Sequence, residues 1–274
     1  MAQIQVVKKK DMKKKRDPLK DQKNIWLAGH CLTLGFGTIF TITYLFHVLL
    51  FFKYRNWKWL FLRVNKDYHF IAGNRWYHSI VRFLPRVFYR MALVGSIISL
   101  SVTMYQNWAT ANPQWYEMLS SENFQMMILA ALWVFVGRRS FYRLFPYMIL
   151  SFIHLTNSKQ EIKGTVEPGK MTKRNVFLLR LLSYSELVVL LALALDSILL
   201  KDGTSGICLT IYFAFYWLRF NFSPYAQATA LDVLGHLDHH VPPKYRPQWD
   251  KVKRFIQAKD EARMRRREKI EKTI

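Results

Sequence analysis

The cluster His236-Leu237-Asp238-His239-His240 has the residue types and the spacing that, in this sequence, are most typical of metal chemistry. Membrane di-iron desaturases and hydroxylases use the H-x-x-H-H spacing to bind two irons through imidazole nitrogens. Such enzymes need further histidine boxes, and the remaining histidines lack that spacing: His30, His47, His69, His78 and His154. We therefore predict a surface turn here, with no metal ion, cofactor or catalytic residue, and a di-iron lipid-modifying enzyme is the alternative.

A second candidate is Glu186, a carboxylate inside the apolar run at residues 176–200. An ionisable side chain at that depth is costly unless it is paired. We predict a structural role for it, either helical packing or pairing with Arg180, which lies six residues earlier on the same run. A transport or proton role for Glu186 is the alternative, in which the protein is a small transporter.

The elements that must position these residues are membrane helices. Hydrophobic residues make up 51% of the 274 residues and gather in six apolar runs, at 25–52, 91–108, 124–136, 144–157, 176–200 and 207–222. Runs of this length are typical of polytopic membrane proteins. We predict an all-α fold with about four transmembrane helices, at 91–108, 124–136, 176–200 and 207–222, and shallower elements at 25–52 and 144–157. Pro146 suggests that the short run at 144–157 is broken or re-entrant.

The run at 25–52 decides the topology. As a straight helix it would be about 42 Å long against a hydrocarbon core of about 30 Å, too long for one upright span and too short for two. Both flanks are basic, with nine Lys or Arg residues from Lys8 to Lys23 and nine from Lys53 to Arg90. Because positive flanks mark the cytoplasmic side, we predict a hairpin that turns at Gly29, Gly35 or Gly37. A full crossing is the alternative.

Charge also predicts the sides of the loops. Residues 109–123 contain Glu117 and Glu122 but no Lys or Arg, which is typical of a lumenal loop. Residues 158–175 contain five Lys or Arg residues and are predicted to be cytoplasmic. Both termini are predicted to be cytoplasmic as well.

Three regions are predicted: a disordered basic arm at 1–23, a helical membrane domain at 24–222 and a basic cytoplasmic region at 223–274. Amphipathic helices at 75–88 and 249–274 are predicted to bind the membrane surface, with packing against neighbouring helices and a solvated helix as the respective alternatives. The predicted membrane contacts are Arg75, Trp76, Ile80, Arg82, Leu84, Arg86, Trp249, Val252, Lys253, Arg254, Phe255 and Ile256. The net charge of +23 favours anionic lipid head groups as a partner over nucleic acid.

A further set of residues, in their order along the chain, resembles the transmembrane protein 33 family, whose fungal members include pore-membrane proteins of the nuclear envelope. The residues that carry the resemblance are Phe145, Pro146, Ser151, His154, Glu186, Arg219, Pro224 and Tyr225. The resemblance covers most of the chain from the first apolar run to about His240. It brings no catalytic residues with it.

The resemblance implies a non-enzymatic membrane protein of the endoplasmic reticulum and nuclear envelope. Such a protein shapes or stabilises curved membrane, organises tubules of the endoplasmic reticulum and supports nuclear pore complex assembly and distribution. The implied partners are reticulon-type hairpin proteins, nucleoporins and, through the basic C-terminal helix, a karyopherin.

Overall fold

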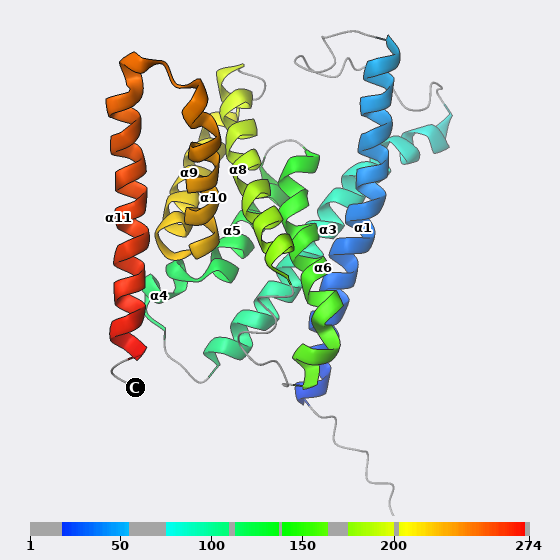
Figure 1. Ribbon diagram of the computed structural model, residues 1–274. Coiled ribbons are helices and arrows are strands. Elements are labelled where there is room, and N and C mark those ends of the chain that lie inside the picture. The colour runs from blue at the N-terminus through cyan, green and yellow to red at the C-terminus, as the bar shows by residue number, and fades with distance from the viewer. Residues whose placement is uncertain are drawn as a thin grey trace, which may run out of the picture.

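The computed structural model describes residues 18–54, 75–109, 113–136, 139–163, 175–199 and 203–271 (Figure 1). In these residues all regular structure is helical: α1 Pro18–Tyr54, α3 Trp76–Trp108, α4 Trp115–Ser120, α5 Glu122–Phe135, α6 Phe141–Lys163, α8 Val176–Ile198, α9 Ser205–Phe222, α10 Pro224–Leu237, two 3-10 turns Asp238–His240 and Pro243–Tyr245, and α11 Arg246–Glu271. The predicted all-α membrane fold is confirmed. Most of the predicted basic arm and the last three residues of the predicted C-terminal helix lie outside the described residues.

By length and composition, three of the described helices could cross a membrane: residues Asp21–Phe46 of α1, all of α3 and all of α8. α5 is a shorter apolar helix of 14 residues. Large apolar side chains on α8, such as Leu191 and Leu195, are more than half exposed, as expected for a helix whose outer face meets lipid. The span within α1 corresponds to the run that we predicted to be shallow.

The predicted hairpin at 25–52 is wrong, because α1 is one continuous helix from Pro18 to Tyr54. Its glycines do not turn the chain. Gly29 instead meets Gly95 of α3 so closely that a Cβ built on Gly29 would lie 2.8 Å from the Gly95 carbonyl oxygen. Small residues that let two backbones approach are typical of helix packing in membranes. Beside this crossing, the hydroxyls of Thr33 and Ser96 are 3.0 Å apart.

The predicted surface helix at 75–88 and the predicted span at 91–108 form one helix, α3. Pro85 lies inside it without ending it, since a proline removes one hydrogen bond of the ladder and neighbouring helices can support the remainder. α3 crosses α1 obliquely, and in Figure 1 its first turns, in cyan, extend past α1. The surface element is therefore continuous with a helix that is long and apolar enough to cross a membrane.

The predicted re-entrant piece at 144–157 is also wrong, because it lies within the 23-residue helix α6. α6 runs antiparallel to α1 along most of its length. Tyr44 and Phe141 stack near one end of the pair, with ring centroids 5.9 Å apart, and Trp26 meets His154 near the other, at 5.5 Å. A long buried contact surface explains why Pro146 is tolerated in the helix interior.

The full length of α6 overturns the predicted sides of two loops. Trp26, near the start of α1, contacts Thr103 in the second half of α3 and His154 in the second half of α6. α3 and α6 therefore end at the same end of the bundle, and α4 lies there too (Figure 1). The described residues of the two loops, 113–123 and 158–163, lie at the same end of the bundle, whereas the charge count predicted opposite sides of the membrane.

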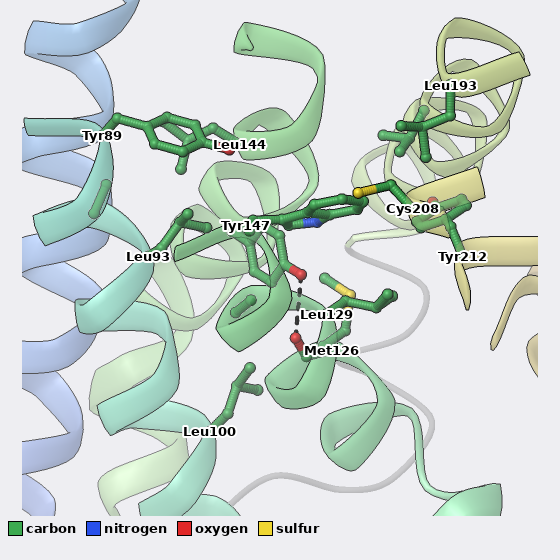
Figure 2. Packing of buried hydrophobic residues seen from close by; sticks show 14 of the residues in the cluster. Tyr89, Leu93, Leu100, Met126, Leu129, Leu144, Tyr147, Leu193, Cys208 and Tyr212 are labelled. Carbon is green, nitrogen blue, oxygen red and sulfur yellow. Dashed lines mark hydrogen bonds between the residues drawn. The ribbon is translucent and has the colours of Figure 1, made fainter. Parts of the chain in front are cut away.

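The core lies where α3, α5, α6, α8 and α9 meet. Figure 2 shows Leu93, Leu129, Leu144 and Tyr147 packed around its centre, all at most 2% exposed. The hydroxyl of Tyr147 donates to the carbonyl of Met126 at 3.1 Å, so its polar end is satisfied inside the apolar cluster. This core fixes the helices that carry the surfaces described below.

Candidate functional site

The first turns of α3 present large apolar side chains to the outside. Trp76 is 77% exposed, Ile80 51% and Phe83 54%. Of the other residues predicted to contact the membrane here, Arg75 and Arg86 are exposed, whereas Arg82 and Leu84 are half-buried. An exposed apolar face bordered by arginines is typical of a helix at the level of lipid head groups.

The C-terminal helix α11 presents a smaller apolar surface than predicted. The carboxylate of Asp238 accepts a hydrogen bond from Trp249 Nε1 at 2.5 Å and forms an ion pair with Lys253 Nζ. Ile256 is buried, and the ring of Phe255 stacks on that of Trp217, 6.4 Å away. The side chains of Trp249, Lys253 and Ile256 therefore face the protein, and their membrane contacts stay predictions. Val252, Arg254 and the open edge of Phe255 are exposed.

Asp238 should hold α11 in place. Hydrogen bonds from Lys253 and Trp249 lower the pKa of the Asp238 carboxyl. Because the folded-state pKa is the lower one, the contact is fully present above the usual carboxyl pKa of about 4 and is lost as the pH falls through the folded-state value. We expect Asp238→Asn to release α11, which trypsin would then cleave several times faster in the full-length protein at neutral pH.

The matched control for this variant is Glu261→Gln. Among the described residues Glu261 pairs with Arg265, at 3.8 Å between exposed side chains, and such a surface pair contributes little to stability. Its cleavage rate should equal that of the native protein. Equal rates for both variants would show that Asp238 does not hold α11.

Two buried polar clusters join residues that carried the family resemblance. In the first, His30 Nδ1 lies 3.1 Å from Ser151 Oγ, and the ring of His30 stacks on that of His154 with centroids 4.7 Å apart. Trp26 packs edge-on against both rings. Ser151 and His154 thus tie α6 to α1. Sequence reasoning gave His30 no role because a lone histidine in an apolar run carries no spacing signal.

In the second cluster Glu186 of α8 forms an ion pair with Arg219 of α9, and both side chains are 6% exposed. The predicted pairing with Arg180 is wrong, because Arg180 is exposed at the start of α8. The hydroxyl of Tyr212 donates to the Glu186 carbonyl at 2.9 Å. A charged pair closed off in this way fits a structural role, since each charge has its counter-charge within the bundle.

The remaining residues of the resemblance also have packing roles. Pro224 occupies the first turn of α10, where a proline costs no hydrogen bond, and the carbonyl of Tyr225 accepts a hydrogen bond from Ser183 Oγ at 3.1 Å. Phe145 packs on Phe141, with centroids 5.1 Å apart, and Pro146 is buried. The hydrogen bond between Ser183 and Tyr225 attaches α10 to α8, and the packing of Phe145 on Phe141 supports the first turns of α6.

The histidine cluster forms an exposed turn. His239 and His240 lie in the 3-10 turn that follows α10, while Asp238 is engaged by α11. His236 and Asp232 share one face of α10, with 3.7 Å between the imidazole and the carboxylate. In the part of the chain that the structure describes, no three His, Cys, Asp or Glu side chains are grouped closely enough to hold a metal ion. The predicted surface turn is confirmed, and the di-iron alternative has no ligand set in these residues.

The apolar spans, the packed helix crossings and the exposed apolar face of α3 define a polytopic all-α membrane protein. Its sequence is 52% identical to that of the Saccharomyces cerevisiae protein named Uncharacterized membrane protein YGR026W, over 270 residues that make up 97% of each chain. The chain belongs to the family of this yeast membrane protein. No protein-family model matches the sequence. No solved structure matches it.

Proposed function

We propose that the protein is a non-enzymatic membrane protein of the endoplasmic reticulum and nuclear envelope that shapes or stabilises curved membrane, as the resemblance to the transmembrane protein 33 family implies. The observation that carries the proposal is the exposed apolar face of the first turns of α3, at Trp76, Ile80 and Phe83. These side chains extend sideways from a transmembrane helix, so they can enter the outer part of one leaflet.

Insertion into one leaflet changes the relative areas of the two leaflets. An apolar face buried about 5–10 Å deep occupies head-group space without reaching the opposite leaflet, and such binding depends on curvature. Because these turns belong to α3, whose later part is locked to α1 through Gly95, the wedge is held at a fixed angle to the bundle. A rigidly held wedge favours the curved membrane that accommodates it.

The basic face of α11 extends the proposal to partners. Lys251, Arg254 and Arg265 are exposed along it, in a helix with many further basic residues. This charge fits anionic head groups or an acidic protein surface, such as that of a karyopherin. In the proposed role the protein acts with reticulon-type hairpin proteins and nucleoporins, and it supports nuclear pore complex assembly and distribution and tubules of the endoplasmic reticulum.

Curvature preference is measured on membrane nanotubes drawn from giant vesicles that contain the labelled full-length protein. We expect the native protein to be several times denser on the tube than on the vesicle. The triple variant W76A/I80A/F83A should lose most of this enrichment, because the alanines fill less of the leaflet.

The matched control is F177A/L195A/I198A, which removes exposed apolar side chains from α8. It should retain the enrichment, since those residues do not belong to the wedge. Equal densities of the native protein on tube and vesicle would contradict the proposed function. A tagged native copy should label the nuclear rim and endoplasmic reticulum, and a label at the cell surface alone would contradict the proposed location.

A further inference from the structure

A group of arginines lies where the surface turns of α3 meet the connection between α5 and α6. Arg86 and Arg90 are one helical turn apart on α3, so their side chains lie on the same face, and both are exposed. Arg139 lies two residues before α6 begins at Phe141. Arg86, Arg90 and Arg139 have no carboxylate or other hydrogen-bond partner among the described residues.

Tyr89 of α3 lies beside Leu144 of α6 in the core (Figure 2). The turn that carries Arg86 and Arg90 therefore lies near the start of α6 and near Arg139, and the three positive charges repel one another. Partial burial lowers the pKa of Arg139, and the positive charges of Arg86 and Arg90 lower it further. Arginine does not lose its proton in response, so the repulsion remains in the folded protein. An arrangement of this kind is stabilised by an anion that contacts all three groups.

Charged side chains next to Arg139 are engaged within the bundle. A fourth arginine, Arg143, is buried behind them with its guanidinium 4.6 Å from the centre of the Trp133 ring. The neighbouring Tyr142 donates a hydrogen bond of 2.6 Å to the carboxylate of Asp196, so that carboxylate is already engaged.

We propose that Arg86, Arg90 and Arg139 bind the phosphomonoester head group of an anionic membrane lipid. The planar fork of a guanidinium matches two oxygens of a phosphate, and a phosphomonoester offers three oxygens and nearly two negative charges to several arginines at once. A phosphodiester head group has one charge and fewer free oxygens.

This inference does not depend on the proposed function. A lipid bound at the arginines could anchor or orient the protein whether or not the wedge on α3 favours curvature. The two also rest on different residues, since the wedge is apolar and the lipid site is built from guanidinium groups. A failure of the nanotube experiment would therefore contradict the proposed function alone, and a failure of the lipid titration would contradict the lipid site alone.

The test titrates the detergent-solubilised full-length protein with short-chain phosphatidic acid and counts bound lipid by native mass spectrometry. The variant R86Q/R90Q/R139Q should bind at least about tenfold more weakly, because it loses charge-assisted hydrogen bonds to phosphate. The control R180Q/K244Q removes two exposed positive charges that lie outside α3 and α11 and should bind like the native protein. Equal binding by the native protein and R86Q/R90Q/R139Q would overturn the site.

Four further measurements identify the ligand. The conservative variant R86K/R90K/R139K keeps the charge but loses the planar forks, so we expect it to bind several times more weakly, and native-like binding would overturn specific recognition. Phosphatidylserine should bind more weakly than phosphatidic acid, and inorganic phosphate should compete poorly. Equal affinity for either one would overturn a phosphomonoester lipid as the ligand. Binding should also weaken as the pH falls below about 6, where a phosphomonoester gains its second proton.

Discussion

Gly95→Ala should destabilise the protein by about 2 kcal/mol, because the crossing of α1 and α3 leaves no space for the new methyl group. A Cβ on Gly95 would lie 2.7 Å from the carbonyl oxygen of Gly29 and 2.8 Å from the backbone nitrogen of Thr33. Both are backbone atoms of α1, so relief requires the two helices to move apart. Such a movement also lengthens the 3.0 Å contact between the hydroxyls of Thr33 and Ser96.

The measurement is the thermal unfolding midpoint of the purified protein in mild detergent. Gly35→Ala is the matched control, since Gly35 lies on α1 as well and a Cβ there meets nothing within 4 Å. That variant should be neutral or slightly more stable, because alanine favours a helix more than glycine does. Similar midpoints for Gly95→Ala and the native protein would mean that α1 and α3 do not cross at these glycines.

The positions of the helices could be predicted from the sequence, because they depend on local apolar runs and on proline and glycine punctuation. α8 and α9 begin and end within a few residues of the predicted runs at 176–200 and 207–222. How each helix packs against its neighbours could not be predicted from these local patterns. For residues 25–52, length and flanking charge favoured a turn at glycine, whereas the structure uses Gly29 for a close helix crossing. One sequence cannot separate these roles, since both follow from the absent side chain.

The predicted sides of the loops differ from the structure for a related reason. The charge count gave residues 109–123 and 158–175 opposite sides because it treated 144–157 as a broken piece. In the structure Pro146 is buried inside α6 and the helix continues to Lys163, so residues 158–163 lie at the end of the bundle opposite to the start of α6. An error in one helix therefore propagates to every later loop. Only the contacts between Trp26, Thr103 and His154 place those ends together.

The candidate surfaces were predictable to different degrees. The exposed apolar face at Trp76 and Ile80 follows from periodicity within one helix, so the sequence could indicate it. The docking of α11 could not be predicted, because Asp238 and Trp249 lie on separate elements. The arginine group was likewise hidden, since Arg86 and Arg139 are far apart in the chain and meet only when α3 packs beside the start of α6. Contacts between helices are the information that a linear pattern lacks.

Glu186→Gln should be among the most destabilising single substitutions in the chain, at about 3–5 kcal/mol. It leaves the guanidinium of Arg219 buried without its counter-charge. Arg219 Nε and Nη2 already lack hydrogen-bond partners among the described residues, so the carboxylate is the group that holds this charge in place. We expect a lower unfolding midpoint in detergent and less full-length protein in the membrane.

A double variant separates this effect from a simple loss of packing. E186Q/R219Q removes both charges, so it should recover much of the stability that Glu186→Gln loses, because an uncompensated buried charge costs more than a neutral polar pair. Arg180→Gln is the control, since the exposed Arg180 is the partner that the sequence favoured. If Glu186 were paired with Arg180, Arg180→Gln would match Glu186→Gln and the double variant would give no recovery. The structure predicts the opposite on both counts, because the charge that Glu186 neutralises is on α9.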